Sequence, residues 1–107
     1  MSYDIHITRA NHWTDSADNP ITLEELKTYF AAKKDFEYSN LFSIAGPFNI
    51  SIDGEFFIWS YEDIKVPFSY SKGRITVPEA EGEVMDKMKE IATELQAIVQ
   101  GDEGEAY

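Results

Sequence analysis

The sequence predicts an α+β fold in one domain, with a mainly antiparallel sheet packed on one face by two helices. Two segments of helical period flank a middle that is rich in strand-forming residues, and period-two segments lie near both ends. Strands segregated between helices in this way favour such a sheet. The expected order is β-α-β-β-β-β-α-β over residues 1–107, with a short acidic tail over about 101–107. A chain of this length suits one hydrophobic core.

Both ends of the chain are expected to contain a strand. Residues 3–8 place Ile5 and Ile7 on one side and polar residues on the other, which is typical of a half-buried strand. Residues 97–100 are expected to form a short last strand before the acidic turn or tail.

Two amphipathic helices are expected between these ends. Thr22 can cap the first, and Glu25 completes a capping box with it, which predicts a helix over 22–34. A second helix is expected over 80–96, because apolar residues recur there at spacings of four, three and four. These residues are Val84, Met88, Ile91 and Leu95.

The middle of the chain combines β-branched and aromatic residues with turn dipeptides. Asp53-Gly54 is expected to turn a two-residue hairpin over 48–60. A second hairpin is expected over 66–77, with its turn at Lys72-Gly73. A further strand near 41–45 is cut short by a Gly-Pro pair.

The net charge of −11, from 9 basic and 20 acidic residues, limits the classes of partner. It repels nucleic acid and anionic membrane surfaces, so neither is expected to bind. A basic protein would instead be steered towards the chain. Cysteine is absent, and neither a signal peptide nor an apolar run of membrane-spanning length is present, which together favour a cytoplasmic location.

No catalytic residue and no cofactor are expected. The glycines are scattered singly rather than gathered into a phosphate-binding loop, and no serine lies in a nucleophile elbow. One alternative is a small metal-dependent or hydrolytic enzyme of unknown substrate. Asp4, His6, His12 and Asp15 would supply imidazole and carboxylate ligands for zinc, iron or nickel, although their spacing is also that of ordinary surface residues.

Acidic residues are concentrated near the C-terminus. The residues from Glu79 onwards carry a net charge of −7. Such a stripe is usually a solvated helix face and tail, but it can also imitate a phosphate backbone. An acidic DNA-mimic regulator is therefore a second alternative.

An aromatic run over 56–61 makes both sides of its strand apolar. One side can face the helices, and the other is either covered by a segment such as that holding Trp13 or exposed as a binding surface. Trp and Tyr are common interface anchors, and acidic residues around them favour a cationic partner. The predicted partner-binding residues are Trp59, Tyr61, Glu62, Asp63, Asp53 and Glu55.

Both ends of the chain resemble a family of small bacterial proteins: the opening reads YDIHITRA, then HW, DS and NPITLEEL, and the ending reads VQGDEGEAY. Some members of that family are similar to immunity proteins encoded beside secreted or contact-delivered toxins. The resemblance implies a small cytosolic protein that inhibits a toxin by covering its active site or a neighbouring surface. Charge and resemblance together predict an immunity protein that binds a cognate basic toxin of the nuclease type.

Overall fold

The computed structural model describes residues 3–44, 47 and 50–107. Its strands and α-helices follow the predicted order, so the fold is α+β as expected, with one additional short 3-10 helix. The elements are β1 (Asp4–Thr8), η1 (Trp13–Asp15), α1 (Leu23–Ala31), β2 (Phe36–Ile44), β3 (Ile50–Tyr61), β4 (Ile64–Ser71), β5 (Arg74–Pro78), α2 (Gly82–Glu94) and β6 (Ile98–Gly101).

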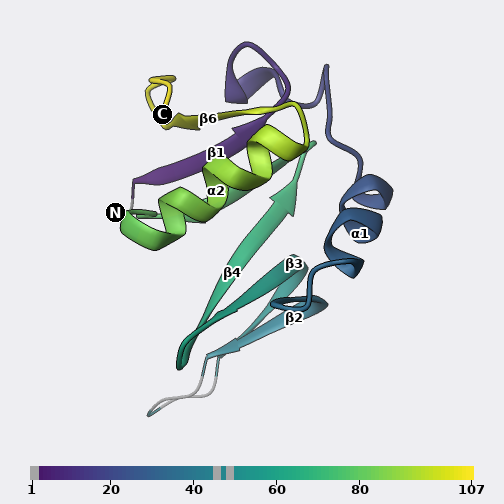
Figure 1. Ribbon diagram of the computed structural model, residues 1–107, viewed down its shortest axis with the longest axis vertical. Coiled ribbons are helices and arrows are strands. Elements are labelled where there is room, and N and C mark those ends of the chain that lie inside the picture. Colours follow the sequence, from purple (N-terminus) through teal and green to yellow (C-terminus); the bar gives the residue numbers. More distant parts are fainter. Residues whose placement is uncertain (1–2, 45–46, 48–49) are drawn as a thin grey trace. The chain divides into compact units, whose positions relative to one another are not determined.

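The chain divides into two compact units. The terminal unit comprises Met1–Thr22 and Ser71–Tyr107, and the central unit comprises Leu23–Tyr70. The strand order is β2-β3-β4 in the central unit and β5-β1-β6 in the terminal unit, and the strand pairings given within the units are antiparallel (Figure 1). Each unit contains one α-helix, which packs on one face of that unit's strands.

In the terminal unit, β1 pairs with β5 on one side and β6 on the other, and α2 lies across β1 and β6 (Figure 1). Ile5 and Ile7 are buried together with Met88 of α2. His6 and Thr8 alternate with them along the strand and are buried as well. The strand is therefore covered on both faces, whereas its alternation predicts a half-buried one.

The segment after β1 provides the second cover. Trp13 stacks on His6, with ring centroids 4.2 Å apart. Gln100 of β6 holds this segment at two points: its side-chain oxygen accepts a hydrogen bond from the Trp13 backbone N–H, and its amide nitrogen donates one to the carbonyl of Asn11, each at 2.8 Å. The Trp13 ring thus covers the face of β1 that carries His6.

The acidic C-terminal residues fold back along β6. The backbone N–H of Gly101 donates to the carbonyl of Glu105 at 3.0 Å, and the N–H of Tyr107 donates to the carbonyl of Val99 at 3.0 Å. Gln100 and Ala106 form an antiparallel bridge. This segment is the acidic turn that the sequence allows, and it is anchored to the sheet.

In the central unit, α1 packs on the strands through aromatic contacts. Phe30 lies 4.6 Å from Phe57 of β3 and 4.4 Å from Phe36 of β2, measured between ring centroids. All three side chains are buried. This cluster forms the core of the unit.

The prediction of a hairpin turn at Asp53-Gly54 is wrong. Strand β3 runs without interruption over Ile50–Tyr61, and β2 pairs with both halves of it. A type I′ turn needs positive φ at both central residues, but neither Asp53 nor Gly54 has one. A Cβ on Gly54 would lie 3.1 Å from the ring of Phe56, so this glycine permits a close side-chain approach within a strand.

The turn at Lys72-Gly73 is confirmed, with φ of 50° and 82° at its two residues, as a type I′ hairpin requires. The turn between β3 and β4 lies at Glu62-Asp63, where Glu62 has φ of 53°. The sequence gives no glycine or asparagine signal there.

The element boundaries differ from the predictions by a few residues. Helix α1 ends at Ala31 instead of Lys34, where the N–H of Lys33 donates to the carbonyl of Phe30 and tightens the last turn. Helix α2 ends at Glu94, because Gln96 adopts φ of 55°.

Strand β2 extends the expected strand near 41–45 back to Phe36. Residues 45, 46, 48 and 49 lie outside the described residues. The last residue of the strand expected near 41–45 and the first two of the hairpin expected over 48–60 fall among them. None of the helices in the described part of the chain is both long and apolar enough to cross a bilayer.

Candidate functional site

The six predicted partner-binding residues all lie in the central unit, on β3 or in the turn that follows it. Asp53, Glu62 and Asp63 are exposed, and Glu55 and Tyr61 are partly exposed. Among the described residues, Glu62 and Asp63 enter no ion pair. Acidic groups are therefore available at both ends of the exposed part of this strand.

Trp59 differs from the other five because only 5% of it is exposed. Its ring packs near Phe36 and Phe68, and its indole N–H donates to a carboxylate oxygen of Asp35 at 2.9 Å. Trp59 belongs to the core of the central unit. Its participation in a partner interface stays a prediction.

A group of aliphatic side chains on β2 and β3 is exposed instead. Leu41 is 40% exposed, Ile50 52% and Ile52 44%. Leu41 lies opposite Asp53 in the strand register, and Ile52 lies opposite the partly exposed Phe42. Phe42, Ile50 and Ile52 share one face of the strand pair, whereas Leu41 and Asp53 form the next pair along and point to the other face. We call Phe42, Ile50 and Ile52 the β2–β3 strip. The sequence does not identify the strip, because Ile50 and Ile52 alternate with polar residues, a pattern that favours burial of the apolar side.

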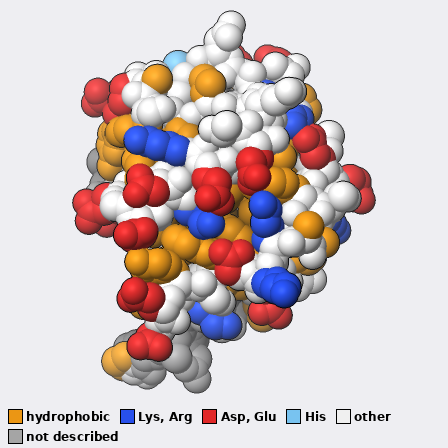
Figure 2. Space-filling model, in the orientation of Figure 1, with side chains coloured by type: hydrophobic (Ala, Val, Ile, Leu, Met, Phe, Trp, Pro, Cys, Tyr) orange, Lys and Arg blue, Asp and Glu red, His pale blue; other side chains and the backbone are white. Residues whose placement is uncertain are grey.

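Acidic groups and tyrosine contacts border this region. The Tyr38 hydroxyl donates to the Glu55 carboxylate, and this hydrogen bond raises the pKa of Tyr38. The ammonium of Lys27 lies 4.8 Å from the centre of the Tyr38 ring. Figure 2 shows hydrophobic, acidic and basic side chains interspersed on one face of the molecule.

The metal-site alternative depends on His6 and His12. Both ring nitrogens of His6 have partners: Nδ1 lies 2.9 Å from the Thr76 hydroxyl and Nε2 lies 2.8 Å from the Asp102 carboxylate. His12 Nδ1 accepts a hydrogen bond from the backbone N–H of Thr14 at 3.2 Å and lies 2.8 Å from the Thr14 hydroxyl. Within residues 3–44, 47 and 50–107, no three His, Asp or Glu side chains come together in a way that could hold a metal ion.

Thr76, His6 and Asp102 form a hydrogen-bonded series of a hydroxyl, an imidazole and a carboxylate, the three group types of a hydrolytic triad. His6 is, however, only 2% exposed, and Trp13 stacks on its ring. Burial lowers the pKa of His6, and Asp102 opposes that effect. Because a substrate could not reach the imidazole, this series is better suited to hold the C-terminal turn on the sheet than to catalyse a reaction.

Asp102 is held from two sides. Its second carboxylate oxygen accepts a hydrogen bond from the Asp4 backbone N–H at 2.8 Å, which together with the His6 bond lowers the pKa of Asp102 against the effect of burial. Its carbonyl accepts the indole N–H of Trp13 at 3.0 Å. Sequence inspection misses this carboxylate, because it looks like one more residue of an acidic tail.

Comparisons with protein-family models, curated proteins and solved structures find no match to this chain. Its function is therefore inferred from the chemistry of its own surface.

Proposed function

We propose that this chain is an immunity protein that binds and neutralises a cognate, basic bacterial toxin of the nuclease type in the cytoplasm. The observation that carries the proposal is the β2–β3 strip, where aliphatic side chains of an ordered strand pair are exposed beside acidic groups. The resemblance of the chain's two ends to immunity-like proteins supports the same function.

The strip offers apolar area that a partner can bury. Complete burial of a Leu or Ile side chain contributes about 1.5–3 kcal/mol. Ile50 is 52% exposed and Ile52 44%, so each has a substantial part of that contribution still to gain. Since contacts at the centre of an interface carry most of the binding energy, these two residues, which share a face, are the best candidates for that centre.

The acidic residues would orient a basic partner and raise its rate of association with the chain. Asp53 directly follows Ile52 on β3, while Glu62 and Asp63 lie in the turn at the other end of β3. Charges at the rim of an interface mainly steer the encounter and fix its register. A basic toxin would therefore associate quickly at low salt and more slowly at high salt.

An inhibitor of this type needs no chemistry of its own. It acts by occupying the toxin's active-site cleft or a surface beside it, where the acidic groups replace the phosphates of the nucleic-acid substrate. A hydrogen-bonded strand pair suits this role, since preorganised surfaces lose less conformational entropy on binding.

The first test is co-expression with the product of the neighbouring open reading frame, followed by co-purification at low and then high salt. We expect one basic protein to be retained and its host to be protected. The substitution Ile52→Ser should weaken retention and protection by about tenfold, the equivalent of roughly 1.4 kcal/mol. Ile98→Ser is the matched control, because Ile98 is 42% exposed on a strand of the other unit.

Two results would count against the proposal. One is a folded chain that neither retains a basic protein nor protects a host from it. The other is equal loss of retention in the Ile52 and Ile98 variants, because the β2–β3 strip would then have no special part in binding.

A further inference from the structure

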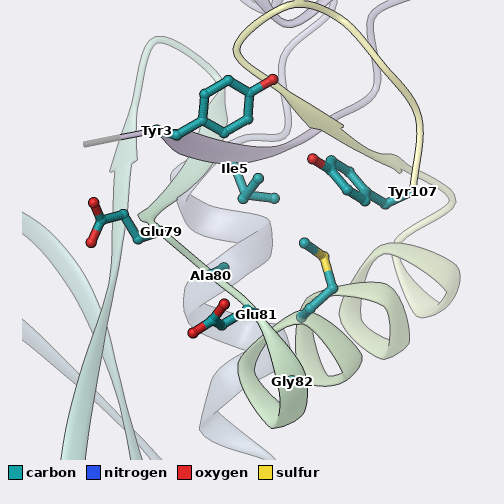
Figure 3. A pocket seen from close by; sticks show the side chains of 8 residues that line it. Tyr3, Ile5, Glu79, Ala80, Glu81, Gly82 and Tyr107 are labelled. Atoms are coloured by element: carbon teal, nitrogen blue, oxygen red, sulfur yellow. The ribbon is translucent and has the colours of Figure 1, made fainter. Parts of the chain in front are cut away.

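A cavity of about 590 Å³ opens in the terminal unit, between the start of β1, the connection from β5 to α2, and the C-terminal residue. Figure 3 shows the rings of Tyr3 and Tyr107 on one side and the first turn of α2 on the other. Ile5 and Met85 also line the cavity and contribute apolar side chains to it. Glu79 and Glu81 also line the cavity.

The two tyrosines are held by one carboxylate. Both hydroxyls donate to the same oxygen of Glu105, that of Tyr107 at 3.2 Å. The rings nevertheless remain accessible, since Tyr3 is 36% exposed and Tyr107 47%. Aromatic faces are therefore fixed at the cavity and open to a ligand.

The charge around the cavity is negative. Glu79, Glu81 and Glu105 contribute three carboxylates, and the hydrogen bonds from the tyrosines lower the pKa of Glu105, so that it stays ionised. Helix α2 begins here and places about half a positive charge at its N-terminus. Three carboxylates outweigh this dipole, so a cation is favoured over an anion.

Glu81 is the residue best placed to meet a cation. It is the N-cap residue of α2, but its side chain makes no capping hydrogen bond. It is exposed and lines the cavity. Its carboxylate is thus not committed to the helix end.

We propose that this cavity binds the guanidinium group of an arginine side chain presented by a basic protein partner. A guanidinium can stack on a tyrosine ring while it donates two parallel hydrogen bonds to a carboxylate. The aliphatic stem of arginine can pack on Ile5 and Met85. Lysine fits less well, because its ammonium is a strongly hydrated point charge that cannot stack. Only the source of the arginine rests on the proposed immunity function.

The cavity can be tested without the partner. The backbone and methyl NMR signals of the ¹⁵N- and ¹³C-labelled chain would be followed during titration with N-acetyl-arginine amide, and then with the uncharged isostere N-acetyl-citrulline amide. We expect saturable shifts at Ile5, Met85 and Tyr107 with arginine, and binding at least about tenfold weaker with citrulline.

Variants locate the site. Glu81→Gln and Tyr107→Ala should each weaken arginine binding several-fold, because they remove the ion pair and the stacking surface respectively. Glu83→Gln is the matched control: Glu83 lies in the same helical turn, is exposed and does not line the cavity. Its variant should bind arginine as the unchanged chain does.

Three results would overturn the proposal: equal binding of arginine and citrulline, equal weakening by the Glu81 and Glu83 variants, or stronger shifts of the same signals by inorganic phosphate. The last would identify an anion site at the helix N-terminus. Saturable arginine binding in a chain that retains no toxin would support the cavity and contradict the immunity function.

Discussion

His6 and Asp102 are separated by 96 positions in the chain, yet the Nε2 atom of His6 lies 2.8 Å from a carboxylate oxygen of Asp102. His6 is 2% exposed, and the Asp102 side chain is 32% exposed. The contact joins the first strand to the turn that follows the last strand. It therefore ties the two ends of the described chain together in the terminal unit.

The first prediction is a loss of stability in mild acid. The pKa of His6 is lowered in the folded chain from its ordinary value of 6.5, mainly by burial, so the unfolded chain takes up a proton at a pH where the folded chain does not. Stability should therefore fall as the pH drops below 6.5, and level off below the lower pKa of folded His6. Urea unfolding from about pH 7 to pH 5 measures this.

The control for this experiment is His6→Gln, which removes the titrating group and should flatten the pH dependence in that range. Asp102→Asn should have a different effect. It removes the carboxylate that raises the pKa of His6, so the folded-state pKa should fall further and the acid-sensitive range should widen. An unchanged pH dependence in His6→Gln would show that other groups cause the effect.

The second prediction concerns Trp59. Since it is buried against aromatic rings, Trp59→Ala should lower the free energy of unfolding by about 3–5 kcal/mol. Trp59→Phe keeps most of the packing and removes the hydrogen bond to Asp35, so it should cost much less. Chemical denaturation of both variants measures the difference. A Trp59→Ala variant as stable as the unchanged chain would contradict the core position.

The order of elements could be predicted from the sequence because it depends on local signals. Hydrophobic period identifies both helices and the first strand, and Lys72-Gly73 carries the glycine that its turn needs. Asp53-Gly54 carries an equally good local signal but does not turn. There the long-range pairing with β2 determines the conformation, and no window of neighbouring residues contains that information.

The candidate sites were less predictable for the same reason. Trp59 was a reasonable surface anchor by residue type, but the packing of Phe36 and Phe68 places it inside. Ile50 and Ile52 alternate with polar residues along β3, yet both are exposed. The acidic residues Glu62 and Asp63 are exposed, as their charge suggests.

The third prediction compares two glycines. Gly73 has φ of 82°, and a Cβ there would lie 2.6 Å from both the Cβ of Pro20 and the carbonyl oxygen of Ser16. Gly73→Ala should therefore destabilise the chain by more than about 1 kcal/mol. Gly54→Ala should cost less, because Gly54 has no positive φ and its close neighbour is the side-chain ring of Phe56, which can move. Thermal unfolding of the two variants makes the comparison, and the reverse order would contradict it.

The fourth prediction concerns the two tyrosines at the cavity. The hydrogen bond to Glu105 raises the pKa of Tyr3 from 10.0 to about 12, because ionising the phenol would place a second negative charge beside the carboxylate. Folding therefore disfavours the phenolate, so this contact's contribution to stability should be lost as the pH rises above 10.0. Ultraviolet absorbance of phenolate follows the titration.

Glu105→Gln removes the negative charge and should return the pKa of Tyr3 towards 10.0. It also removes two of the causes that raise the pKa of Tyr107, so more phenolate should form near pH 10.0 than in the unchanged chain. Glu103→Gln is a weaker change, because Glu103 acts on Tyr3 mainly through its backbone N–H, which the substitution keeps. A titration curve that Glu105→Gln leaves unchanged would mean that the carboxylate does not hold the ring. Glu105→Gln should then weaken arginine binding only through the loss of one negative charge, because the position of the stacking surface would not depend on that contact.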